Sequence, residues 1–153
     1  MYKGMTKLIY ASAVLLLATN HAYGANETEA YKLAVIDANQ FVKHGGMEDK
    51  RAQAAITAAR TVCDVKSEGV ISSQAVLVTN LLAKDEIFAR PVDILEGLNA
   101  VLNGGKSKAN CSRVMANYAG LRKESGFTHS QAIASMRVLE NTSRQMTKDT
   151  SKP

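Results

Sequence analysis

Cys63 and Cys111, the only two cysteines of this 153-residue chain, are the residues whose type and spacing most directly indicate chemistry. In an oxidising compartment two cysteines usually form a disulfide, and here only one intramolecular pairing exists. Such a bridge would contribute roughly 4 kcal/mol by closing a long loop. A reactive thiol, a metal site and an intermolecular bridge are the alternatives. Because the chain has no Cys-x-x-Cys, and His44 and His129 share no ligand spacing with the cysteines, we predict a structural disulfide.

The acidic residues form no catalytic pattern. Adjacent carboxylates occur at Glu48-Asp49 and Asp85-Glu86. Neighbouring residues on a helix point to different sides, so these pairs are expected on solvated faces or at caps and not as a general acid and base. No serine stands in a G-x-S-x-G nucleophile elbow. We therefore predict no catalytic residue and no enzyme activity.

The histidines and the glycine-rich segment also favour structural roles. His44 is expected at the C-terminal end of a helix, where an imidazolium is favourable, and His129 in the first turn of another helix. The segment 104–107 (GGKS) lacks the spacing of a phosphate-binding loop. We predict no cofactor and no metal ligand.

The first 24 residues have the pattern of a cleaved secretory signal peptide. Lys3 and Lys7 give a basic start, Leu8–Thr19 is an apolar run of suitable length, and Ala22–Gly24 offers a small-x-small site for cleavage before Ala25. The run is shorter than the roughly 20 residues that span a bilayer. The alternatives are an uncleaved anchor and an ordinary buried helix. We predict export to the bacterial periplasm or the medium, without stable membrane insertion after cleavage.

Cleavage would leave 129 residues, enough for one hydrophobic core at 25–146, followed by a disordered polar tail at 147–153. Loss of Lys3 and Lys7 reduces 19 basic residues to 17 against 14 acidic ones. A net charge of +3 does not indicate nucleic-acid binding. Tyr118–Met136 resembles a helix–turn–helix, but export favours a plain helix hairpin.

Helical spacing of apolar residues predicts an all-α, compact, irregular bundle of about six short helices stapled by the disulfide. Pro91 suits a first helical position, and Thr128 with Gln131 suits a capping box. The third helix is expected to be capped by Ser72 or Ser73. The other expected helices are 26–44, 48–65, one from Pro91 to Gly104-Gly105, 108–124 and 129–146. The side chains expected inward include Phe41, Val42, Val76, Leu77, Leu81, Leu82, Val92, Leu95, Leu98, Val101, Leu102, Ile133, Met136 and Leu139.

The 48-residue separation of the cysteines, in a small exported helical chain, is similar to that in enterobacterial acid-stress periplasmic chaperones. The likeness covers this spacing alone, because the surrounding residues do not match, and no residue role is carried over. It implies a stress chaperone as one functional hypothesis.

The leading hypothesis is an exported, non-catalytic protein-binding module, such as an inhibitor, an immunity protein or a secretion-system accessory. Its partner would be another protein of the cell envelope or a secreted protein, and a homodimer stays open. The other hypotheses are the stress chaperone and an enzyme acting on envelope polymers, which would need convergent titratable groups in a cleft.

Overall fold

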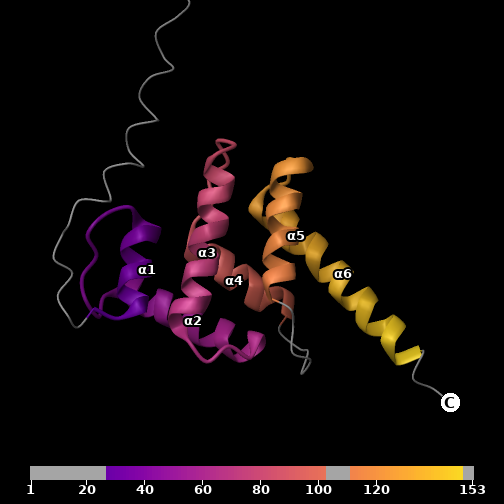
Figure 1. Ribbon diagram of the computed structural model, residues 1–153, viewed down its shortest axis with the longest axis horizontal. Helices are drawn as coiled ribbons and strands as arrows, with labels where there is room; N and C mark the ends of the chain where they lie inside the picture. Colours follow the sequence, from indigo (N-terminus) through magenta and orange to yellow (C-terminus); the bar gives the residue numbers. More distant parts are fainter. Residues whose placement is uncertain (1–26, 103–110, 150–153) are drawn as a thin grey trace, which may run out of the picture.

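The computed structural model describes residues 27–102 and 111–149. Across these residues it has six α-helices and no β-strand, which confirms the predicted all-α class (Figure 1). The expected signal peptide at 1–24, the helix stop at Gly104-Gly105 and residues 150–153 lie outside the described residues. The helices are α1 (Glu29–Ala38), α2 (Met47–Cys63), α3 (Glu68–Ala83), α4 (Pro91–Leu102), α5 (Cys111–Glu124) and α6 (His129–Asp149).

α4 is the central helix, and it contacts each of the other five. Pro91 occupies its first position, as predicted. All five side chains expected inward are buried: Val92, Leu95, Leu98, Val101 and Leu102. Its start is held by α1, because the Asp37 carboxylate accepts a hydrogen bond from the Val92 N–H at 2.8 Å. A carboxylate suits this end of a helix, where the first N–H groups have no partner within the helix.

The predicted disulfide joins the last residue of α2, Cys63, to the first residue of α5, Cys111, with a Cα–Cα distance of 5.6 Å. Both cysteines are buried. α2 approaches its neighbours closely because its inward positions are mostly alanines. One sign of this close approach is that the Asn99 side chain of α4 donates to the Ala55 carbonyl at 3.2 Å.

α1 is shorter than the sequence predicted. Thr28 caps its start by accepting the Tyr31 N–H at 3.1 Å. The helix ends at Asn39, which takes the left-handed conformation at φ 52°, and not at the glycines after His44. Asparagine tolerates this conformation, so it can end a helix early. Phe41, expected inward on this helix, lies in the following loop and is 82% exposed.

α3 begins earlier than expected. Its N-cap is Ser67, and Ser72 is a buried residue inside the helix, not a cap. Gly69 is accommodated in the first turn of this helix. The Ser72 hydroxyl donates to the Gly69 carbonyl at 3.3 Å and to Glu29 of α1, also at 3.3 Å.

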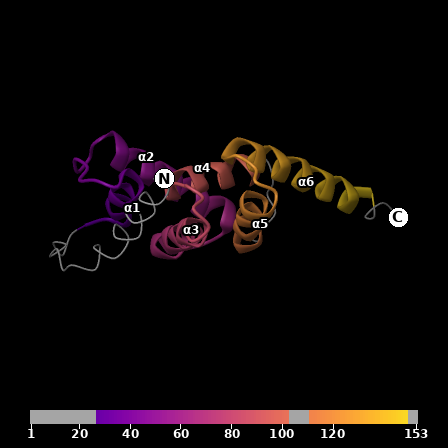
Figure 2. The same ribbon diagram turned by 90° about the horizontal axis from the view of Figure 1, so that it is seen from above.

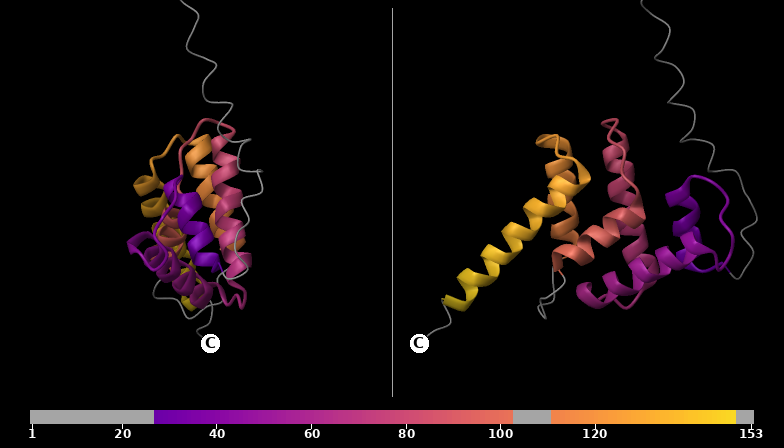
Figure 3. Two further views of the ribbon diagram at one scale, coloured as in Figure 1. Left: turned by 90° about the vertical axis from the view of Figure 1, so that its left-hand side faces the viewer. Right: turned by 180° about the vertical axis from the view of Figure 1, so that it is seen from behind.

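α6 begins as predicted and then leaves the body of the bundle. Thr128 and Gln131 form the capping box, with backbone-to-side-chain hydrogen bonds of 2.9 and 3.3 Å. The buried apolar side chains of α6 are Ala132, Ile133 and Met136. Beyond them the helix projects outward and runs to Asp149 (Figure 2, Figure 3). Leu139, expected inward, is therefore 58% exposed.

Candidate binding surface

α3 carries apolar side chains on two of its faces. One face enters the core through Ile71, Ala75, Val78 and Leu82. The other holds Val70, Leu77 and Leu81, which are 47%, 68% and 43% exposed. The sequence predicted that Leu77 and Leu81 point inward, and this prediction is wrong. α3 has more apolar residues than one core-facing stripe can hold, and the surplus faces solvent.

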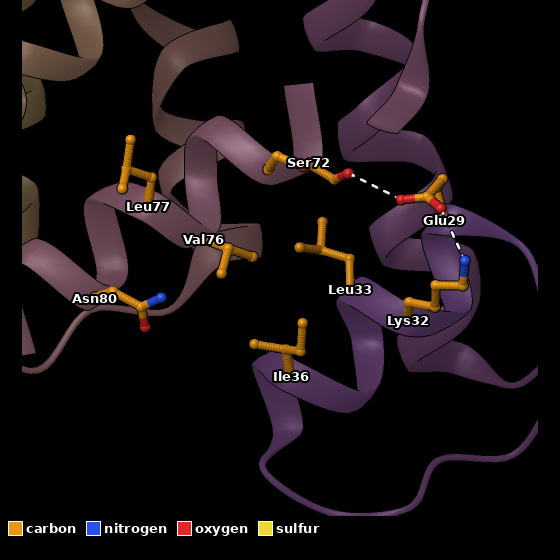
Figure 4. Close-up of a pocket in the computed structure, with 9 residues that line it drawn as sticks. Glu29, Lys32, Leu33, Ile36, Ser72, Val76, Leu77 and Asn80 are labelled. Carbon is orange, nitrogen blue, oxygen red and sulfur yellow. Dashed lines mark hydrogen bonds and ion pairs between the residues drawn. The ribbon is translucent and has the colours of Figure 1, made fainter. Parts of the chain in front are cut away.

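The outward face of α3 borders a groove against α1. The two helices run side by side in the same direction, because Glu29 lies near Ser72 at one end and Ile36 and Asn80 line the groove together at the other. The groove has a volume of about 350 Å³. Its walls are Glu29, Lys32, Leu33, Ile36, Ser72, Ser73, Val76, Leu77 and Asn80 (Figure 4).

The groove is apolar in the middle and polar at its ends. Leu33 and Ile36 of α1 point toward Val76 of α3 (Figure 4). At one end Glu29 accepts a hydrogen bond from the Lys32 ammonium at 3.0 Å, so the two charges compensate each other. This arrangement can bind an apolar side-chain ridge, and the one carboxylate on its wall already has two donors, Lys32 and Ser72.

Three carboxylates, on α1 and α4, are paired with arginines. Arg51 of α2 lies 2.5 Å from Asp93 and 2.6 Å from Glu96, both on α4. The hydrogen bonds that Arg51 donates to Glu96 are the main cause that raises the pKa of the Arg51 guanidinium. Asp37 pairs with Arg90 in the same region. These pairs clamp α1, α2 and α4 together, and each of the three carboxylates is engaged by an arginine.

The members of the other two acidic pairs, expected on solvated faces or at caps, have different surroundings. Asp49 is buried and accepts the Gly45 N–H at 2.7 Å, whereas Glu48 is exposed. Asp85 pairs with Lys123 of α5 at 2.9 Å, and Glu86 sits in the turn after α3 with φ 60°. Neither pair forms two carboxylates that face a shared cleft.

The two histidines occupy different environments. His44 was expected at a helix end, but α1 stops earlier, so His44 lies in the loop before α2. Its ring stacks on Tyr31 with centroids 4.1 Å apart, and its Nδ1 is 3.5 Å from Asp49 Oδ2. His129 is the first residue of α6, as predicted, and its Nδ1 is 3.0 Å from the Tyr118 hydroxyl of α5.

Two arrangements of side chains were not predicted from the sequence: the α1–α3 groove and the contact between Tyr118 and His129. The α1–α3 groove was missed because Leu77 and Leu81 were placed inward. The second α3 stripe, with residues at i, i+7 and i+11, was the signal that could have revealed it. The contact between Tyr118 and His129 depends on the turn between α5 and α6, and their spacing of 11 residues carries no pattern of its own.

Among the residues that the structure describes, no three His, Cys, Asp or Glu side chains are placed to hold a metal ion. No helix in the described ranges is long and apolar enough to cross a membrane. No family model, no curated protein and no solved structure matches the chain. The interpretation of the groove as a binding surface therefore depends on its geometry alone.

Proposed function

We propose that the protein is an exported, non-catalytic protein-binding module and that the groove between α1 and α3 is its binding surface. The observation that carries this proposal is the outward apolar face of α3, where Leu77 is 68% exposed beside the groove. A contiguous exposed apolar patch with polar edges is typical of an interaction site. The Cys63–Cys111 disulfide is compatible with an oxidising compartment, which supports export.

The occupant that fits the groove is the apolar ridge of an amphipathic helix from another envelope or secreted protein. From Glu29 to Ile36 the groove follows about 10 Å of α1, at 1.5 Å per residue. This length matches a ridge made by residues i, i+4 and i+7 of a partner helix. The compensated pair of Glu29 and Lys32, with uncharged Ser73 and Asn80, leaves no unbalanced charge on the walls. An uncharged ridge is therefore a better match than a charged peptide.

The test is an affinity capture from a native envelope extract, with the oxidised chain as bait, followed by binding measurements with the purified candidate partner. Leu77→Glu should weaken that binary complex by about tenfold or more, because it places a charge on the exposed apolar wall of the groove. Val138→Glu is the matched control, since Val138 is 65% exposed on α6, away from the groove. It should leave the affinity unchanged.

Other results would contradict the proposal in different ways. Equal affinity of the wild-type protein and Leu77→Glu would remove the groove from the binding surface. A wild-type dimer that Leu77→Glu converts to a monomer would identify a second copy as the occupant. Many weak clients captured at acid pH would favour the stress chaperone. Failure to capture any partner, together with turnover of an envelope polymer, would favour the enzyme.

A further inference from the structure

The start of α6 is tied to α5 by a chain of three polar side chains. Arg122 Nη1 donates to the Tyr118 hydroxyl oxygen at 2.7 Å, and that hydroxyl lies 3.0 Å from His129 Nδ1. Arg122 Nη2 also donates to the Phe88 carbonyl at 2.9 Å, so its guanidinium is fixed at both sides. Tyr118 is buried, and His129 lies at the edge of the body. In Figure 1, α1 lies on the opposite side of α3 from α5 and α6.

The direction of each hydrogen bond in this chain follows from the donors. A guanidinium can only donate, so the Tyr118 oxygen accepts from Arg122. The Tyr118 proton is then free to go to His129 Nδ1. Burial raises the pKa of Tyr118, which keeps that proton in place near neutral pH. A neutral His129 that accepts this proton at Nδ1 carries its own proton on Nε2.

Burial, more than the surrounding charges, disfavours a second proton on His129. Burial is the largest cause that lowers the pKa of the imidazole from its ordinary value of 6.5, and Arg122 of α5 acts in the same direction. Asp93 and Glu96 of α4 act in the opposite direction, but both carboxylates are engaged by Arg51 of α2. On α6 itself, Arg137 lines the same pocket as His129, and the positive end of the helix dipole lies at the imidazole.

We propose that the Arg122–Tyr118–His129 chain is a proton-sensitive latch that holds α6 against α4 and α5 and releases it in mild acid. Protonation at Nδ1 removes the acceptor of the Tyr118 hydroxyl and places a second cation beside Arg122. The Tyr118 proton is then left in a buried site without its partner, an unfavourable arrangement. Loss of this tie loosens the junction between α5 and α6.

Release of α6 would uncover an apolar face on α4 and α5. Ile133 and Met136 of α6 cover a closely packed region whose other members are Ile94, Leu98, Val114, Met115 and Tyr118. Gly97 permits this close packing, because an added Cβ would lie 2.3 Å from Ile133 Cδ1 and 3.3 Å from His129 Cε1. The latch and the apolar contact therefore lie side by side, and opening of one weakens the other.

The pH range follows from the direction of the pKa shift. The folded-state pKa of His129 lies below its unfolded value of 6.5, so the unfolded or opened state binds the proton more readily. The stability that neutral His129 contributes is fully present above pH 6.5 and is lost as the pH falls through the folded-state pKa. α6 is therefore expected to open progressively below pH 6.5.

The test is hydrogen–deuterium exchange of the oxidised protein, isolated as the cell produces it, at a series of pH values above and below 6.5. Protection factors, corrected for the intrinsic pH dependence of exchange, should fall several-fold more in the first half of α6 than in α4. His129→Gln retains a side-chain acceptor for Tyr118 but does not titrate, so it should lose most of this difference. His44→Gln is the matched control and should behave as the wild-type protein.

A second measurement keeps the test decisive if the His129 variant does not fold. The imidazole resonance of His129 in the wild-type protein should titrate with a midpoint below 6.5, and resonances of α6 should shift with the same midpoint. A midpoint at or above 6.5 would overturn the latch. Equal acid-induced loss of α6 protection in His129→Gln and the wild-type protein would also overturn it, as would full protection of α6 throughout the titration.

Discussion

α3 and α4 are neighbouring apolar helices that use similar residues in different ways. The apolar residues of α4 follow one helical stripe, and all five that were expected inward are buried. Those of α3 occupy two faces, and the core accepts only the face that includes Leu82, leaving Leu77 and Leu81 outward. The difference shows that apolar content measures how much surface a helix can bury, whereas its neighbours decide which face is buried. The surplus on α3 is apolar surface that stays exposed to solvent.

The largest expected contrast comes from truncating one leucine on each helix. Leu95→Ala on α4 should lower the free energy of unfolding by about 3 kcal/mol, because Leu95 is fully buried and its loss leaves a cavity. Leu77→Ala on α3 should change it by less than about 0.5 kcal/mol, since the side chain is mostly exposed. Urea unfolding at neutral pH measures both. Leu82→Ala serves as the control: it is buried on α3 and should resemble Leu95→Ala. Similar losses in the free energy of unfolding for Leu77→Ala and Leu82→Ala would contradict the assignment of one buried and one exposed face on α3.

A smaller contrast is expected at the starts of the two helices. Asp37→Ala should lower the free energy of unfolding by about 2 kcal/mol, because it removes the acceptor of the Val92 N–H and the partner of Arg90. Ser67→Ala at the start of α3 should cost only about 0.3 kcal/mol, since the Ser67 side chain makes no capping hydrogen bond. Urea midpoints of the two variants provide the comparison. A Ser67→Ala loss as large as that of Asp37→Ala would contradict it.

The smallest contrast concerns one glycine on each helix. Gly97→Ala on α4 should lower the free energy of unfolding by about 1.5 kcal/mol, because the new methyl group would displace Ile133. Gly69→Ala on α3 should raise it by about 0.5 kcal/mol, since the nearest atoms to an added Cβ are 3.7 Å away and alanine restricts the unfolded chain. Thermal unfolding of both variants measures these changes in stability, which should have opposite signs. A gain in stability for Gly97→Ala would show that α6 packs less tightly on α4 than the structure describes.

Local signals predicted the parts of the fold that depend on a few adjacent residues. Pro91 marked the start of α4, and Thr128 with Gln131 marked the start of α6, because each rests on conformations or hydrogen bonds within one turn. The disulfide followed from the count of two cysteines. The end of α1 was misplaced because two signals competed, and the left-handed Asn39 acted before the glycines were reached.

The features that the sequence did not predict depend on residues distant along the chain. The carboxylate at the start of α4 comes from Asp37, 55 residues before Val92. The outward orientation of Leu77 depends on where α1 and α5 pack against α3. Leu139 carries the helical spacing of an inward residue, but α6 projects beyond the helices that would have covered it. The periodicity of apolar residues predicts which face of a helix is apolar. The tertiary arrangement decides how much of that face other helices cover.

The Cys63–Cys111 bridge divides the chain topologically. The covalent ring that it closes contains α3 and α4, whereas α1 and α2 precede the ring and α5 and α6 follow it. If the protein is exported as proposed, Cys63 emerges first, and the ring cannot close until α3 and α4 have followed and Cys111 is exposed to the oxidant. Once closed, the ring holds α3 and α4 within one covalent loop. The wall of the groove on α1 and the latch on α6 both lie outside this ring, so only noncovalent contacts, such as the pair of Asp37 with Arg90, hold them to the helices inside it.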